Sequence, residues 1–108
     1  MKIIGEIDSA DMFKYNLEAH ALARSVCVRR FLLNLIEARN VNSVIDDYDF
    51  AYKNIGPSPE FLHGIRVALL VSPDDHSHDF INILFKNTGE TIDLFVDQEE
   101  AVSFLLAE

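Results

Sequence analysis

The sequence is poor in the residue types on which several common functions depend. Its single cysteine, Cys27, excludes an intrachain disulfide and any metal cluster built on cysteines. Its four glycines stand apart from one another, so no glycine-rich loop of the phosphate-binding kind is present. Nine basic residues against eighteen acidic ones give a formal net charge of -9, which opposes contact with nucleic acid or an anionic membrane. We therefore expect neither nucleic acid nor a membrane as a partner.

Long hydrophobic runs are also missing. No segment approaches the length of a membrane span, and the first residues, Met1 to Glu6, lack the apolar region and cleavage site of a signal peptide. Cys27 stands between Val26 and Val28, which favours a buried core cysteine over a reactive thiol. A lone cysteine also suits a reducing compartment. These features predict a soluble, cytoplasmic protein.

The chain does contain two apolar runs that are too short to be buried helices. Gly64 to Ser72 is apolar on both faces, as expected for a strand in the middle of a parallel sheet. Arg30 to Glu37 has the same character and is interrupted only by Asn34. At 108 residues and 49% hydrophobic content, the chain predicts a single domain, residues 1–108, with one modest core.

Helical patterns alternate with the strand patterns along the whole chain, and a capping residue precedes each helix. The expected strands cover residues 2–8, 30–37, 64–72 and 91–96. The expected helices follow the caps Ser9, Ser43, Ser72 and Asp97, and the run Gly56 to Pro59 is the strongest linker signal. Strand and helix repeated four times predict an α/β fold with a four-stranded, mainly parallel sheet and helices on both faces.

The last third of the chain carries a family resemblance. Lys86 to Gly89 ends a helix, and Ile92 to Val102 gives a strand, a short acidic turn and another helix. In this pattern the chain resembles the STAS domain of sulfate-transporter tails and bacterial anti-sigma-factor antagonists, especially its stand-alone bacterial relatives. The resemblance implies a STAS-like fold with strand order 2-1-3-4. It also implies signalling without catalysis, in which the domain binds a protein partner or switches between partners.

In that strand order, the strand at Arg30–Glu37 lies at an open edge of the sheet, because the family's extra leading strand is missing here. An open edge favours pairing with another chain, a homodimer included. Charged side chains at the same edge would instead blunt it, and both interpretations remain open. The residues that would do so are Arg29, Arg30, Glu37 and Arg39.

Ser43 has two interpretations. The resemblance places it at the phospho-acceptor position of the antagonists, although Val44 and Ile45 replace the serine and glycine that follow there. Asp46 and Asp47 would then lie beside the phosphate and repel it. The alternative is a helix N-cap, for which a serine hydroxyl is well suited.

The implied strand order also predicts where a ligand would bind. The sheet would reverse direction between strands 1 and 3, and open α/β sheets bind ligands at such a point. The residues that would flank this crevice are Asp8, Ser9, Ser72, Asp74, Asp75 and His76.

Catalytic chemistry has little support in the sequence. After a helix start, His76 and His78 would lie about 200° apart around the axis, so a metal would need further ligands such as Asp8 or Asp11. An enzyme would have to use Asp8, His76 or His78, yet no serine or cysteine is placed for His76 to activate. We expect no catalytic set, no metal site and no cofactor.

These observations favour a non-enzymatic regulatory or protein-interaction module whose partner is another protein or a second copy of the chain. The alternative is an α/β domain that binds a small molecule or a metal in the crevice between strands 1 and 3.

Overall fold

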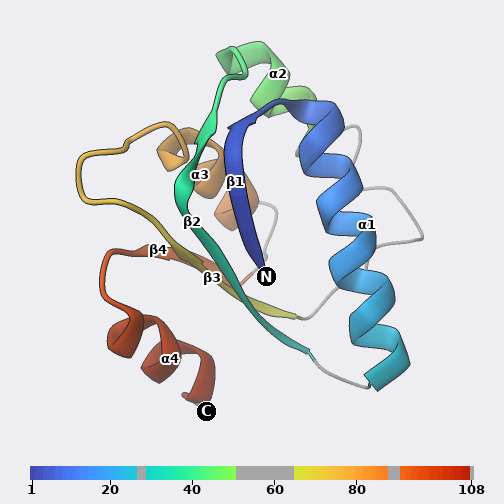
Figure 1. Ribbon diagram of the computed structural model, residues 1–108, viewed down its shortest axis with the longest axis vertical. Helices are drawn as coiled ribbons and strands as arrows, with labels where there is room; N and C mark the ends of the chain where they lie inside the picture. The colour runs from blue at the N-terminus through green and yellow to red at the C-terminus, as the bar shows by residue number, and fades with distance from the viewer. Residues whose placement is uncertain (27–28, 51–64, 88–90, 108) are drawn as a thin grey trace.

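The computed structural model describes residues 1–26, 29–50, 65–87 and 91–107, and strands alternate with helices along them (Figure 1). The predictions for Cys27, for the linker Gly56–Pro59 and for the helix end at Gly89 lie outside the described residues. None of the described helices combines the length and apolar character that crossing a membrane requires. The elements are β1 (Lys2–Ile7), α1 (Ser9–Val26), β2 (Arg30–Asn40), α2 (Val44–Asp49), β3 (Arg66–Leu70), α3 (Asp79–Asn87), β4 (Thr91–Phe95) and α4 (Gln98–Leu106).

The four strands form one sheet in which each neighbouring pair is parallel. This confirms the predicted α/β class and the parallel sheet. The predicted strand order 2-1-3-4 is wrong, because β2 is hydrogen-bonded to β1 on one side and to β3 on the other, which gives the order β1-β2-β3-β4. The expected open edge at Arg30–Glu37 is wrong for the same reason. Among the described strands, the edges of the sheet are β1 and β4.

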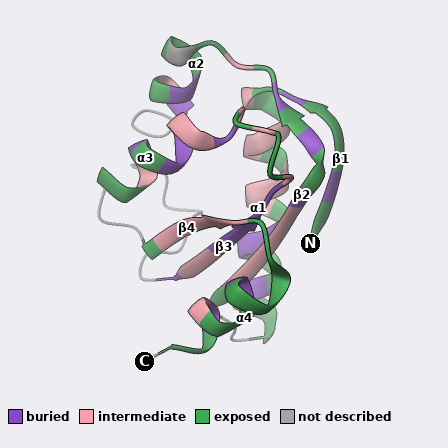
Figure 2. Ribbon diagram, turned by 90° about the vertical axis from the view of Figure 1, so that its left-hand side faces the viewer, coloured by how far each residue is buried: buried purple, intermediate pink, exposed green. Residues whose placement is uncertain are grey.

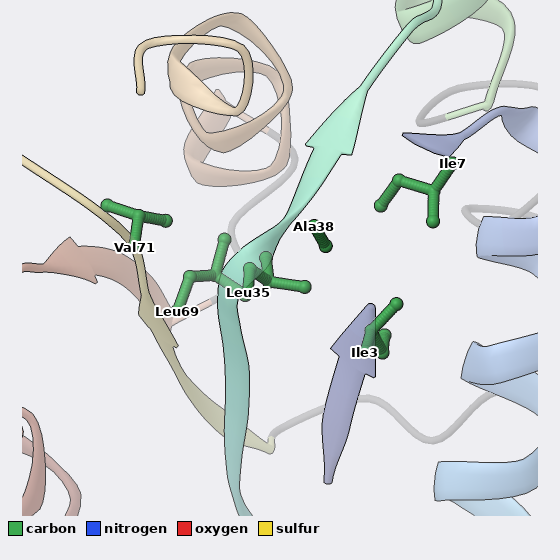
Figure 3. Packing of buried hydrophobic residues seen from close by; sticks show 6 residues of the cluster. All are labelled: Ile3, Ile7, Leu35, Ala38, Leu69 and Val71. Atoms are coloured by element: carbon green, nitrogen blue, oxygen red, sulfur yellow. The ribbon is translucent and has the colours of Figure 1, made fainter. Parts of the chain in front are cut away.

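Helices lie on both faces of this sheet. Leu69 of β3 belongs to a buried cluster (Figure 3) against which Met12 of α1 packs. Ala68, the preceding residue, points to the opposite face and packs with Ala101 and Leu105 of α4. The core therefore has two parts, one on each side of β3.

The connections explain which helix lies on which face. When parallel strands follow one another in space, right-handed crossovers place all connecting helices on the same face. Phe13 and Leu17 of α1 pack in one cluster with Phe50, at the end of α2, and with Ile81 and Leu84 of α3. α4 follows the last strand and makes no crossover, so it is free to cover the other face (Figure 2).

A β-bulge interrupts the pairing of β1 with β2. Lys2 pairs with Asn34, but Ile4, two residues later, pairs with Glu37, so β2 has one extra residue in this interval. The side-chain oxygen of Asn34 accepts a hydrogen bond of 3.1 Å from the backbone N–H of Ile36. The polar residue that interrupts the apolar run thus supplies a partner for a backbone group at the irregularity.

The bulge decides which side chains of β2 are buried. Leu35 and Ala38 both belong to the cluster on the α1 face, although they are three positions apart in a strand. Ile36 and Glu37, which lie between them, are exposed. Without the extra residue, strict alternation would turn either Leu35 or Ala38 toward the other face.

The helix α3 begins at Asp79 and not directly after Ser72, as the sequence predicted. The N–H of Asp75 donates to the carbonyl of Ser72 at 3.1 Å, which closes a turn with Pro73 at its second position, where a fixed φ is favourable. The first helical hydrogen bond runs from Asn82 to the carbonyl of His78. The proline therefore starts a turn, and residues 72–78 form a loop.

Candidate functional site

The residues expected to flank a crevice lie on opposite sides of β2. Asp8 and Ser9 follow β1, whereas Ser72 and the residues after it follow β3. A sheet whose strand order follows the chain has no reversal of direction, which is the feature that places a crevice between two strands. The strand arrangement behind the predicted crevice is therefore wrong. Binding of a small molecule or a metal by these residues stays a prediction.

Asp8 has a structural role at the start of α1. Its carboxylate accepts a hydrogen bond of 3.0 Å from the N–H of Asp11, and its own N–H donates to the Asp11 carboxylate at 3.3 Å. The N–H of Met12 donates to the carbonyl of Asp8, so Asp8 is the cap of the helix. Ser9, the predicted cap, is the first helical residue.

The loop of residues 72–78 takes the place of a strand beside the far end of β2. Pairing between β2 and β3 ends at Asn34, whereas β2 continues to Asn40. The N–H of Asn40 donates to the hydroxyl of Ser77 at 3.0 Å, and Nε2 of His78 lies 3.1 Å from the carbonyl oxygen of Ala38. Side chains of the loop thus bind backbone groups of β2 beyond the point where β3 ends.

Asp75 orders this loop. Its carboxylate accepts a hydrogen bond of 2.9 Å from the N–H of Ser77 and lies 3.6 Å from Nε2 of His78. Burial alone would raise the pKa of Asp75. Hydrogen bonds from the N–H and the hydroxyl of Ser77, together with the nearby His78 and Arg39, outweigh burial and lower this pKa below its ordinary value of 3.8. The carboxylate is therefore held in its charged form as part of the loop.

The two histidines lie in different environments. The side chain of His78 is 2% exposed, whereas that of His76 is 78% exposed and has Nδ1 3.1 Å from the carboxylate of Asp79. Asp74 is also exposed. Across the described parts of the chain, no group of three or more His, Cys, Asp or Glu side chains could hold a metal ion. The structure does not bring the predicted crevice residues into one chemical site.

A buried polar cluster that the sequence did not suggest follows β2. Asp47 is 4% exposed, and its carboxylate accepts hydrogen bonds from the side-chain amides of Asn40 at 2.9 Å and Asn42 at 3.2 Å. The Asn42 amide also lies 3.4 Å from the sulfur of Met12. In the sequence, Asn40 and Asn42 at the end of an apolar strand are the feature that could have indicated this cluster. It fastens α2 to the end of β2.

Ser43 forms the helix cap that was one of its two predicted roles. Its hydroxyl accepts a hydrogen bond of 3.2 Å from the N–H of Asp46, and its own N–H donates to the Asp46 carboxylate at 3.3 Å. This reciprocal pair is a capping box, in which aspartate takes the position usual for glutamate. Ser43 is exposed. Its phosphorylation stays a prediction.

The face of the sheet opposite α1 has an uncovered part, which the sequence analysis missed. α4 packs against β2, β3 and β4, and its cluster includes Leu32 near the start of β2. The outward residues of β1 and of the far half of β2 are exposed, with Ile4 at 66% and Ile36 at 46%. We call this surface the open face, and it consists of Lys2, Ile4, Glu6, Ile36, Glu37 and Arg39.

A signal for the open face is present in the sequence. Lys2, Ile4 and Glu6 alternate with the buried Ile3 and with Ile7, which is the pattern of a strand with one covered and one uncovered face. β1 also contains Gly5, and a glycine within a strand often marks a bulge or a close approach of another backbone.

A search against known protein families, curated proteins and solved structures finds no match to this chain, so the resemblance to STAS domains rests on the sequence pattern alone.

Proposed function

We propose that this chain is a non-enzymatic protein-interaction module and that the open face is its binding surface. The observation that carries the proposal is the unequal covering of the sheet. On the face occupied by α4, the described helices leave β1 and the far half of β2 exposed, with Ile4 and Ile36 at the centre of this area. Exposed apolar side chains surrounded by polar ones are typical of surfaces that bind another protein.

The charge of the open face supports the same proposal. The whole chain has a formal net charge of -9, which keeps it apart from other acidic proteins. The open face carries Lys2 and Arg39 together with Glu6 and Glu37, so its charges balance. Lys2 and Glu37 lie 2.7 Å apart, and both side chains are more than half exposed. A second acidic protein can approach this surface with less repulsion than elsewhere.

The polar groups best suited to a reaction are engaged within the fold. Asp75, Ser77 and His78 bind one another or the backbone of β2, and Asp47 is held by two asparagines. A general base must be able to reach a substrate proton, and His78 is 1% exposed. These contacts favour binding over catalysis as the function of the domain.

Photo-crosslinking in the native host tests the proposal. A photoreactive amino acid replaces Ile36 on the open face in one variant and Leu22 of α1, which is 61% exposed, in a matched control. We expect protein adducts with the probe at position 36 and few with the probe at position 22, because only the first lies on the proposed surface. Equal adduct patterns at both positions, or none at either, would contradict the proposal.

A further inference from the structure

Building on the proposed function, we propose that the outer edge of β1, which borders the open face, binds a second copy of this chain. The two β1 strands would lie antiparallel to each other, related by a two-fold axis at Ile4. The two sheets would then continue across the axis as one sheet. A strand at the edge of a sheet binds another strand through its unpaired backbone groups.

The outer edge of β1 is accessible. Among the described strands, β1 pairs only with β2, and Figure 2 shows it at the margin of the sheet. Gly5 has no side chain and is nevertheless exposed, so the exposure at this position belongs to the backbone itself. Ile4, beside it, is 66% exposed. A long aliphatic side chain in the middle of an edge strand favours pairing, whereas a charged residue there would oppose it.

The order of charges along β1 matches this pairing and selects its register. In an antiparallel pair centred on Ile4, Lys2 of one copy lies opposite Glu6 of the other, and the same contact recurs across the axis. Ile4 then faces Ile4. Opposite charges directly across two strands stabilise the pair, and like charges oppose it. The symmetric interface thus forms two ion pairs and one apolar contact from three residues, as an isologous dimer requires.

Gly5 lies within the segment that would pair. It has a φ of 97°, a conformation that side-chain-bearing residues rarely adopt. In the proposed register it lies opposite Ile3 of the second copy, where it has no side chain of its own. β1 has only six residues, Lys2–Ile7, so the paired segment is short and the two Lys2–Glu6 contacts contribute a large share of the specificity.

Charge exchange at positions 2 and 6 tests the pairing. The variants are Lys2→Glu, Glu6→Lys and the double variant that combines them, and analytical ultracentrifugation measures their dimer dissociation constants at physiological ionic strength. Each single variant places like charges together at both symmetric contacts, and we expect its dimer to weaken about tenfold or more. The double variant exchanges the two charges and should dimerise like the natural chain.

Two further features make the result specific. An equimolar mixture of the two single variants should form a heterodimer, because both contacts between positions 2 and 6 then join a lysine to a glutamate.

Rescue in the double variant cannot come from better folding. The exchange puts a glutamate at position 2 beside Glu37 and a lysine at position 6 beside Arg39, both unfavourable within one chain. Thermal unfolding followed by circular dichroism checks that all variants remain folded.

A monomeric natural chain at the highest soluble concentration would overturn the inference, and so would a dimer that the double variant fails to restore. Either result leaves the protein-interaction function intact if the probe at Ile36 still captures another protein. Loss of adducts at Ile36 together with a monomeric chain would contradict both the strand pairing and the proposed function. Dimerisation with the full charge-exchange pattern supports the strand pairing, and adducts at Ile36 support the open face as a binding surface.

Discussion

The far end of β2, on the side of β3, and the outer edge of β1 both lack a neighbouring strand among the described residues, and the fold treats these two edges in opposite ways. Beside the far end of β2, where β3 has ended, the loop of residues 72–78 supplies the hydroxyl of Ser77 and the imidazole of His78 to backbone groups of β2. Beside β1, no described strand or loop replaces the missing neighbour, and Ile4 is exposed. The first edge is closed within the chain, whereas the described residues leave the second uncovered.

The structure gives these two regions roles opposite to those that the sequence suggests. The acidic, histidine-containing loop attracted functional hypotheses because it is polar and follows a buried strand. Three of its side chains, those of Asp75, Ser77 and His78, order the loop or bind β2. The short opening strand attracts a functional hypothesis only at its last residue, Asp8, yet it supplies half of the residues of the open face. A polar motif at a strand end can therefore be structural, because backbone groups that lose a strand need other partners.

The largest effect should follow from opening the closed edge. We expect His78→Ala to destabilise the fold by about 3 kcal/mol, because it removes a fully buried ring and leaves the carbonyl of Ala38 without its hydrogen-bond donor. His76→Ala is the matched control and should change the free energy of unfolding by less than about 0.5 kcal/mol, since its side chain is 78% exposed. Urea unfolding measures both. Similar values for the two variants would show that the loop does not close this edge.

A smaller effect should come from Gly5, the residue of positive φ in the open edge. Gly5→Ala is expected to destabilise the fold by about 1–2 kcal/mol, because alanine is strained at a φ of 97°. An added Cβ would meet no atom within 4 Å, so the effect is one of backbone conformation and not of packing. Urea unfolding at neutral pH measures this change in the free energy of unfolding. A variant as stable as the natural chain would mean that position 5 can take another φ without loss.

The charge of Asp75 should contribute about 1 kcal/mol to the free energy of unfolding at neutral pH. Asp75→Asn keeps an acceptor oxygen for the N–H of Ser77 but loses the stronger hydrogen bonds of a carboxylate. The pKa of Asp75 is lowered in the folded state, so its stabilisation is complete well above the ordinary value of 3.8. It is lost as the pH falls through that value and then through the lower folded-state pKa.

Urea unfolding of the natural chain and of Asp75→Asn across this acidic range checks the sign. The difference between the two free energies of unfolding should be largest near neutrality and should shrink toward zero below the folded-state pKa of Asp75. Asp93, whose pKa is also lowered, is common to both proteins and leaves the difference unaffected. A difference that grows on acidification would contradict the assigned direction.

Local patterns predicted the class of the fold, and the strand order was missed. Four strands, four helices and a parallel sheet follow from periodicity, which depends on each segment's own residues. Strand order depends on contacts between distant segments, and the order 2-1-3-4 came from the family resemblance. The apolar character of Arg30–Glu37 on both faces already favoured a central position, which β2 occupies. The charged residues Lys2 and Glu6 are likewise typical of an edge strand, the position that β1 occupies.

The candidate site was predicted less well, for a related reason. Ser43 is the helix cap that a local rule proposed, because a capping box involves residues three apart in the sequence. The role of His78 depends on the carbonyl of Ala38, forty positions earlier in the chain. No local pattern shows that β2 extends beyond the end of β3, where its backbone groups need other hydrogen-bond partners. Ser72 and Pro73 suit the start of a helix, but the same residues also favour the turn that is present.

The smallest effect on stability should occur at the centre of the open face. Ile36→Ser should change the free energy of unfolding by less than about 0.5 kcal/mol, because the side chain is already 46% exposed and its N–H stays bound to Asn34. Leu35→Ala, one position earlier but 5% exposed, should destabilise by about 3 kcal/mol. Urea unfolding separates the two neighbours. If Ile36→Ser also destabilises strongly, the side chain packs within the fold, and the surface around it is not free to bind a partner.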